Sequence, residues 1–103
     1  MSEIRPSVLW FARWMEQKLQ INDNKKTGWG TESFIFLFAR LFDEVRELEE
    51  ALSQYLTQDY PKTDKIKEAV ISECADVANL AHMIADKIRG CPNGPRGKEE
   101  SPA

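Results

Sequence analysis

The sequence has little of what several common classes of protein require. Its only two cysteines, Cys74 and Cys91, fit neither a zinc site nor a disulfide framework, so we interpret both as reduced thiols in a cytoplasmic protein. The formal net charge of −3 gives no electrostatic reason to bind nucleic acid. No apolar run reaches the roughly 20 residues of a membrane span, and the charged N-terminal stretch is unlike a signal peptide. The composition therefore disfavours membrane proteins, disulfide-rich secreted proteins and general nucleic-acid binders.

Glycine and proline are also scarce until the chain approaches its end. Three of the five glycines and three of the five prolines lie within residues 90–103, a stretch with almost nothing apolar. Burial of apolar surface cannot offset the entropy of ordering such a segment. We therefore predict one all-α domain over residues 1–90 and a disordered tail over residues 91–103.

Three stretches of the domain have the apolar spacing of amphipathic helices. The first helix is predicted from residue 6 to about residue 20, and a polar loop with two glycines follows over residues 21–30. The second is predicted to begin at the N-cap Thr31 and to end near residue 58. The third is predicted to begin at the N-cap Thr63 and to end near residue 89. The short connection between the second and third helices predicts that they pack antiparallel.

The second helix has more apolar surface than two neighbouring helices can cover. Its apolar residues recur in steps of four and three, and residues 34–38 are apolar on every side. Large exposed apolar patches are rare on monomers. We therefore predict an antiparallel bundle of three main helices, completed by oligomerisation as a dimer or tetramer into cores like four-helix bundles. Trp10 and Trp14, one turn apart on the first helix, are predicted to lie in the core.

Two pairs of carboxylates interrupt the apolar pattern of the second and third helices. Glu44 and Glu47 are three residues apart, as are Glu73 and Asp76, so each pair lies on one helix face. Antiparallel packing can bring the two pairs to one point, where ionised carboxylates are unfavourable unless a positive charge compensates them. No lysine or arginine is expected in the same stripes at matching height. A hard divalent cation would supply the compensation; the alternative is an ordinary solvated helix face.

The same residues carry a resemblance to a known family. Residues 43–47, Asp-Glu-Val-Arg-Glu, are followed after 25 residues by residues 73–76, Glu-Cys-Ala-Asp. This arrangement resembles the EExxE…ExxD signature of the MazG-like nucleotide pyrophosphohydrolases, which are related to the all-α dimeric dUTPases. The resemblance covers about residues 29–88. Its one departure from the signature is mild, with Asp43 in place of the leading glutamate.

The resemblance implies a Mg²⁺-dependent enzyme. Glu44, Glu47, Glu73 and Asp76 would be its metal ligands and catalytic residues. The implied reaction is hydrolysis of a nucleoside triphosphate, with deoxynucleotides favoured, to the nucleoside monophosphate and pyrophosphate. Such an activity would serve house-cleaning of the nucleotide pool. Asn79, one turn beyond Asp76, could bind the metal or a substrate oxygen.

Two further features of the family are matched less closely. Trp29 precedes the second helix, where some relatives have an aromatic side chain that stacks on the nucleobase; the alternative is a loop residue that caps the end of the bundle. Many members also have a basic residue early in the second helix, where this sequence is apolar. Lys62, Lys65 and Lys67 could replace it or be ordinary surface charges.

Two other functions stay open from the sequence. A helical oligomerisation or interaction protein would carry the acidic residues merely as a solvated face. A phosphoribosyl-ATP pyrophosphohydrolase would share the helical fold, although His82 follows the aspartate of the motif by six residues, where that family has four. Metal binding separates the first alternative from a pyrophosphohydrolase, and substrate choice separates the second.

Overall fold

The structure is a computed structural model that describes residues 3–22 and 29–90, and helices account for most of them. No strand occurs in either described segment. In chain order the elements are helix α1 (Pro6–Asn22), the 3-10 helix η1 (Trp29–Thr31), helix α2 (Phe34–Thr57) and helix α3 (Asp64–Ile88). The predicted tail at residues 91–103 lies outside the described residues, as does most of the predicted loop before α2.

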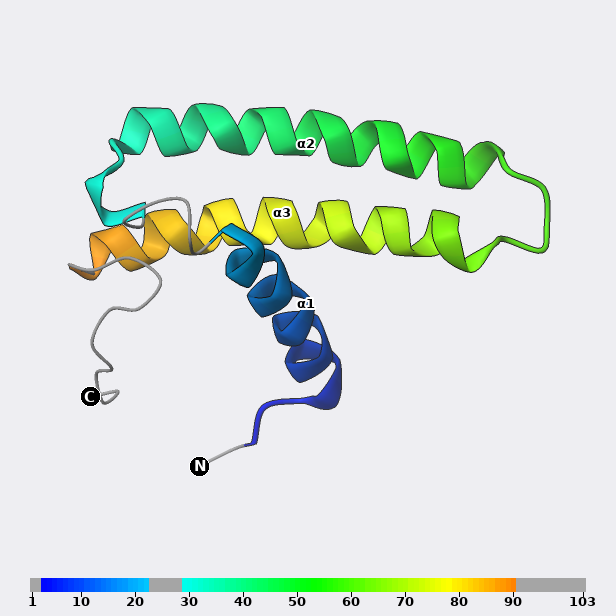
Figure 1. The fold of residues 1–103 in the computed structure, drawn as a ribbon, viewed down its shortest axis with the longest axis horizontal. Helices are drawn as coiled ribbons and strands as arrows, with labels where there is room; N and C mark the ends of the chain where they lie inside the picture. The colour runs from blue at the N-terminus through cyan, green and yellow to red at the C-terminus, as the bar shows by residue number, and fades with distance from the viewer. Residues whose placement is uncertain (1–2, 23–28, 91–103) are drawn as a thin grey trace.

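The three long helices pack in one arrangement centred on α3. Helices α2 and α3 lie side by side and run antiparallel, and α1 crosses α3 at an angle, as Figure 1 shows. The connection between α2 and α3 is short, and the antiparallel packing that it favours buries the facing apolar stripes of the two helices. The predicted all-α class, with three helices packed against one another, is confirmed.

Helix α2 begins two residues later than the sequence predicted. The Oγ of Ser33 accepts a hydrogen bond from the backbone N of Phe36 at 3.0 Å, so Ser33 is the N-cap. Thr31 ends η1 instead, where the backbone N of Glu32 donates to the carbonyl of Trp29 at 3.1 Å. The predicted cap at Thr31 is wrong because this 3-10 turn, anchored by the buried Trp29, separates Thr31 from the first turn of α2.

The remaining helix ends agree more closely with those predicted from the sequence. Thr63 is the N-cap of α3, as predicted, because its Oγ1 accepts from the backbone N of Ile66 at 3.2 Å. Gly90 follows α3 with a φ of 94°, a left-handed conformation that glycine adopts without steric cost. Helix α1 continues to Asn22, two residues beyond its predicted end.

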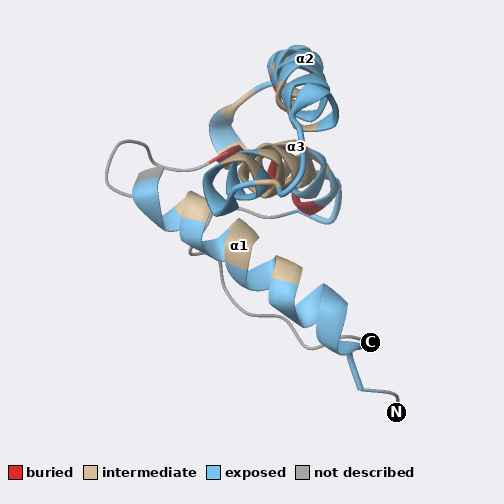
Figure 2. Ribbon diagram, turned by 90° about the vertical axis from the view of Figure 1, so that its right-hand side faces the viewer, coloured by how far each residue is buried: buried red, intermediate tan, exposed pale blue. Residues whose placement is uncertain are grey.

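The buried core is small and lies where α2 begins and α3 ends. Buried and partly buried apolar side chains from all four elements meet there, namely Trp29, Leu37 and Leu80 with Leu19, Leu41, Met83 and Ile84 around them. Most of α1 faces away from α3 and is exposed (Figure 2). Trp10 is 48% exposed, so its prediction as a core residue is wrong. The reason is that α1 packs chiefly against α3, so the opposite side of α1 has no neighbour among the described helices.

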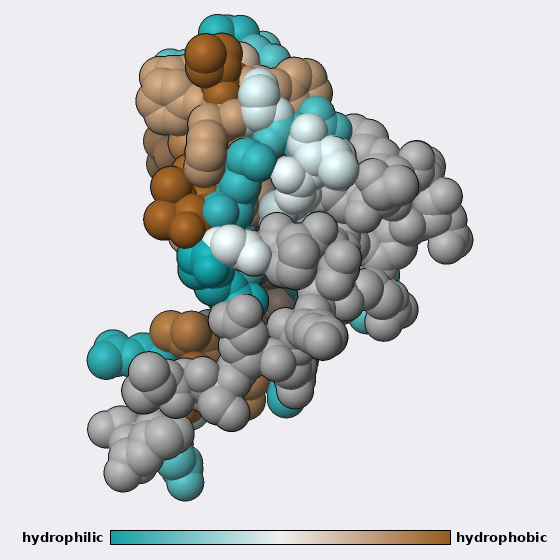
Figure 3. Space-filling model, turned by 90° about the vertical axis from the view of Figure 1, so that its left-hand side faces the viewer, coloured by the Kyte–Doolittle hydropathy of each residue, from teal (hydrophilic) through white to brown (hydrophobic). Residues whose placement is uncertain are grey.

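Helix α2 also leaves apolar side chains uncovered. Among the apolar residues of α2 that are at least 41% exposed, five recur at spacings of three, four or seven residues, and we name these five the α2 stripe: Phe34, Phe38, Phe42, Val45 and Leu52. Figure 3 shows apolar surface gathered over the beginning of α2. Despite this surface, none of the described helices is both long enough and apolar enough to cross a membrane.

Candidate metal centre

Three glutamates meet between the middles of α2 and α3. Glu44 and Glu47 lie one turn apart on α2, and Glu73 lies on the facing side of α3. One carboxylate oxygen from each lies within 4.8 Å of the other two. The antiparallel pairing of α2 and α3 therefore brings together three of the four predicted carboxylates from positions almost 30 residues apart, as the sequence led us to expect.

Two of these glutamates each have an oxygen without a hydrogen-bond partner. The Oε1 atoms of Glu44 and Glu73 are buried, and no donor among the described residues reaches either of them. The side chain of Glu44 is only 13% exposed. Buried polar atoms are nearly always paired, so two orphaned carboxylate oxygens at one point need a partner that residues 3–22 and 29–90 do not supply.

The surroundings make both carboxylates harder to ionise. Burial raises the pKa of Glu44 above its ordinary 4.5, and the negative charges of Asp76 and Glu47 raise it further. Burial likewise raises the pKa of Glu73, again with Asp76 and Glu47 contributing in the same direction. A cation bound among these side chains would reverse the effect, because it favours their ionised forms.

Asp76, the fourth predicted ligand, lies beside the group and not in it. Its Oδ2 is 3.3 Å from the Nζ of Lys18 on α1. Its charge still raises the pKa of both Glu44 and Glu73, so it remains electrostatically part of the centre. Its role as a ligand stays a prediction.

Two basic side chains reach the centre, which corrects the sequence expectation of none. The Nη2 of Arg40 is 3.6 Å from the Oε2 of Glu44, one turn along α2. The Nζ of Lys18 pairs with Asp76 and donates to the Oγ of Ser72 at 2.8 Å. The sequence did not predict Arg40 at the centre because this residue lies beside the apolar stripe. It did not predict Lys18 there because this residue belongs to another helix. The charge of Arg40 lowers the pKa of Glu44 and that of Lys18 lowers the pKa of Glu73, yet both pKa values remain raised, so the compensation is incomplete.

Trp29 and Asn79, the predicted substrate-binding residues, lie outside the glutamate group. Trp29 is 7% exposed, its Nε1 donates to the Oδ2 of Asp86 at 3.0 Å, and its ring packs edge-on against His82. This burial favours the alternative role of closing the end of the bundle. Asn79 is 3% exposed and its Nδ2 donates to the carbonyl of Met15 at 3.1 Å, which ties α1 to α3.

Lys62 is one of the three lysines that the sequence offered either as a phosphate contact or as a surface charge, and it contacts the end of α2. The Nζ of Lys62 donates to the carbonyls of Tyr55 and Gln58 at the end of α2 and lies over the rings of Tyr55 and Tyr60. It thereby satisfies carbonyl groups that a helix end leaves unpaired. The sequence alternative of an ordinary charge fits Lys62 better than substrate binding.

The donor set suits a hard divalent cation. Carboxylate oxygens are the ligands that Mg²⁺ and Ca²⁺ prefer, and no thiol or imidazole belongs to the group. Comparison of the chain with known protein families, curated proteins and solved structures gives no match. The chemistry of the centre therefore rests on its own residues and their geometry.

Proposed function

We propose that the protein is a Mg²⁺-dependent pyrophosphohydrolase that converts nucleoside triphosphates, deoxynucleotides above all, to nucleoside monophosphate and pyrophosphate. The observation that supports this best is the group Glu44, Glu47 and Glu73, with oxygens within 4.8 Å of one another and two of them buried without a partner. The resemblance of residues 43–47 and 73–76 to the MazG-like signature supports the reaction class.

The chain supplies the groups that such a reaction needs. Glu44, Glu47 and Glu73 would hold the cation, with Asp76 as a further ligand. Bound Mg²⁺ would neutralise charge on the triphosphate and polarise the phosphorus–oxygen bond that breaks. One of the carboxylates would accept the proton of the water that attacks the α-phosphorus. Arg40, next to Glu44, would donate to a phosphate oxygen once the carboxylates are neutralised.

A panel of ribonucleoside and deoxynucleoside triphosphates, assayed with Mg²⁺ and with EDTA, tests the proposal. We expect equal amounts of pyrophosphate and nucleoside monophosphate, and no turnover in EDTA. Phosphoribosyl-ATP belongs in the panel, because its selective hydrolysis would favour the second enzyme named from sequence. Release of single orthophosphates, or turnover that ignores EDTA, would overturn the assignment.

The α2 stripe supports the further proposal that copies of the chain associate. Its five residues are apolar, lie along one side of α2 and are exposed, and obligate interfaces are built from such surface. We expect wild type to sediment as a dimer or tetramer at micromolar concentration. Phe42→Glu should shift it toward monomer, whereas Glu49→Gln, a polar change on exposed α2 surface, should not. A monomeric wild type would refute self-association.

A further inference from the structure

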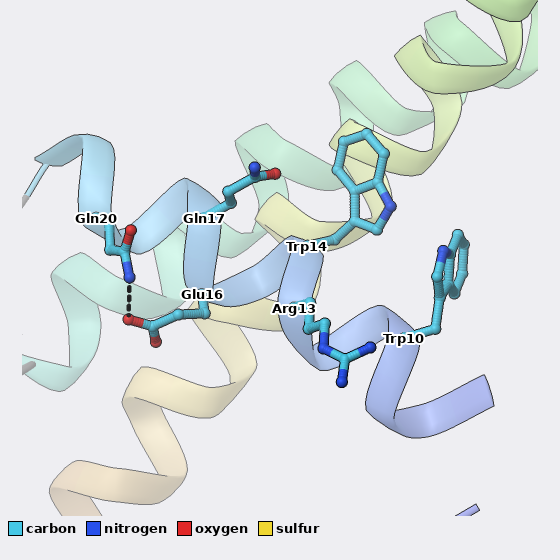
Figure 4. Close-up of a pocket in the computed structure, with 6 residues that line it drawn as sticks. All are labelled: Trp10, Arg13, Trp14, Glu16, Gln17 and Gln20. Atoms are coloured by element: carbon cyan, nitrogen blue, oxygen red, sulfur yellow. Dashed lines mark hydrogen bonds between the residues drawn. The ribbon is translucent and has the colours of Figure 1, made fainter. Parts of the chain in front are cut away.

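Helix α1 packs against α3 with one side and leaves the opposite side open. The open side carries a hollow that α1 alone forms, as Figure 4 shows, lined by Trp10, Arg13, Trp14, Glu16, Gln17 and Gln20. The side toward α3 carries Met15, Lys18 and Leu19. The carbonyl of Met15 accepts from the Nδ2 of Asn79 at 3.1 Å, and Leu19 packs against the buried core. Of the three residues on this side, only Lys18 is charged.

Lys18 is attached to α3 next to the metal centre. Its Nζ lies 3.3 Å from the Oδ2 of Asp76 and donates to the Oγ of Ser72 at 2.8 Å. Ser72 and Asp76 are four residues apart, so both lie on the side of α3 that α1 crosses. The side chains of Lys18 and Asp76 are only 28% and 26% exposed. Water and salt therefore screen this ion pair less than they screen a fully exposed one.

Asp76 also belongs electrostatically to the three glutamates. It lies one turn from Glu73 on α3, and its charge raises the pKa of both Glu73 and Glu44. The charge of Lys18 lowers the pKa of Glu73. The ammonium of Lys18 thus offsets part of the same negative charge that a bound divalent cation would offset. A carboxylate that ligated such a cation and kept the ammonium would hold a double and a single positive charge close together, and these repel each other.

We propose that Lys18 is a built-in counter-ion that competes with a divalent cation for Asp76. Without a bound cation Lys18 pairs with Asp76, and its ammonium must withdraw before that carboxylate can become a metal ligand. The four-carbon stem of a lysine is flexible enough for the ammonium to move while the helix stays in place. The attachments of α1 through Met15 and Leu19 do not involve Asp76. The proposal rests on the metal site of the proposed function, and it means that α1 lowers the affinity of that site.

The opposite role for Lys18 would be to support Asp76 as a metal ligand. An ammonium that stayed on Oδ2 while the other oxygen of Asp76 bound the cation would orient the carboxylate, as hydrogen-bonding partners of metal ligands commonly do. Loss of such a support weakens metal binding, whereas loss of a competitor strengthens it. Competition fits better because the charge of Lys18 acts on Glu73 as well as on Asp76, so it opposes the cation at two ligands. The sign of one substitution therefore separates the two roles.

The test is the affinity of the full chain for Mn²⁺, which takes the same oxygen ligands as Mg²⁺ and is measured by electron paramagnetic resonance. Lys18→Met and Lys18→Gln both remove the charge while keeping much of the side chain. We expect each to bind Mn²⁺ about fivefold more tightly than wild type, the factor that corresponds to an ion pair of about 1 kcal/mol. Lys18→Arg keeps the charge and should resemble wild type. Arg13→Met removes a cation from the open side of α1 and should also bind like wild type.

A double-mutant cycle tests whether Asp76 is the group for which Lys18 competes. In the Asp76→Asn background, Lys18→Met should change the affinity for Mn²⁺ little, because the contested carboxylate is gone. Urea unfolding gives a second measurement. Lys18→Met should be less stable than wild type in EDTA and close to wild type in excess Mn²⁺, because the bound ion breaks the same ion pair in wild type.

The outcomes distinguish this inference from the proposed function. If wild type binds Mn²⁺ and both neutral variants bind it equally or more weakly, Lys18 does not compete, and the metal site stands. Equal strengthening by Lys18→Met with and without Asp76→Asn would also overturn the inference, since it would show repulsion through space without competition for Asp76. If neither wild type nor the neutral variants bind Mn²⁺, the inference and the metal-dependent function both fail. Circular dichroism of each variant establishes that a changed affinity is not a lost fold.

Discussion

Asp86 and Glu73 are both carboxylates within α3, but they differ in whether their oxygens have hydrogen-bond partners. Asp86 is 6% exposed, and both of its oxygens have partners: Oδ2 accepts from the Nε1 of Trp29 and Oδ1 pairs with Arg89. Glu73 faces other carboxylates, and its Oε1 is buried without a partner. The first carboxylate completes a network within the chain, whereas the second leaves a need for positive charge.

This difference has an energetic meaning. A buried carboxylate that receives hydrogen bonds from a neutral donor and a guanidinium recovers much of its lost hydration, and it fixes the donor as well. Asp86 thus anchors Trp29, and through it the 3-10 turn that precedes α2. Repulsion among Glu44, Glu47 and Glu73 has the opposite effect on the free energy of unfolding unless a cation binds. We therefore interpret the end of the bundle as the stabilising region and its middle as the functional region.

The largest expected contrast between the two regions is in catalysis. Glu73→Gln removes charge from the metal centre and should lower Mg²⁺-dependent pyrophosphate release at least about 100-fold, because carboxylates are required ligands of this ion. The same loss is expected for each of the other three carboxylates, in Glu44→Gln, Glu47→Gln and Asp76→Asn. Asp86→Asn keeps an acceptor for Trp29 and should change the rate constant by no more than about threefold. If Glu73→Gln and Asp86→Asn lowered the rate equally, the division into a functional middle and a stabilising end of the bundle would be wrong.

The free energy of unfolding should depend more on Asp86 than on Glu73, which is the reverse of the order expected for catalysis. Asp86→Ala leaves the Nε1 of Trp29 buried without an acceptor and should lower the free energy of unfolding by about 1–3 kcal/mol. The loss should appear in a thermal or urea unfolding curve. In the Trp29→Phe background, which has no indole donor, Asp86→Ala should cost less. Glu73→Ala in EDTA should show no comparable loss. Additive effects of Asp86→Ala and Trp29→Phe would show that the hydrogen bond contributes little.

Most of the fold could be predicted from the spacing of apolar residues. The facing stripes of α2 and α3 and the cap at Thr63 are local features, and each was found from sequence. The cap at Ser33 was missed because Thr31 has the same chemistry, and what decides between them is the docking of Trp29 against α3 through Asp86, 57 residues away. Trp10 was misplaced because spacing shows that a helix has an apolar side but not which neighbour covers it.

The sequence predicted the carboxylates of the candidate metal centre, but not the lysine and arginine that pair with them. Glu44, Glu47 and Glu73 occupy helix faces that the antiparallel pairing alone brings together. The position of Lys18 depends on where and at what angle α1 crosses α3, and no residue spacing specifies this. Asp76 shows the consequence: it has the predicted position on α3, but a lysine from α1 is already paired with it.

The third contrast is the dependence of metal-free stability on pH, and its sign follows from Glu44 and Glu73. Burial, with Asp76 and Glu47, raises the pKa of both side chains above the ordinary 4.5. From about pH 4.5 up to the raised pKa values, these two side chains therefore bind more protons in the folded chain than in the unfolded chain. Over that window the contribution of these two residues to the free energy of unfolding falls as the pH rises.

Melting curves in EDTA at about pH 4 and about pH 7.5 measure this contribution against wild type. Glu73→Gln cannot ionise at that position, so its melting temperature relative to wild type should rise between the two pH values. Glu49→Gln, an exposed carboxylate on α2, should stay parallel to wild type. Excess Mg²⁺ at the higher pH should then stabilise wild type more than Glu73→Gln, because the ion binds the folded centre selectively. Parallel curves for wild type and Glu73→Gln, together with no response to Mg²⁺, would contradict metal binding by the three glutamates and favour the non-enzymatic alternative.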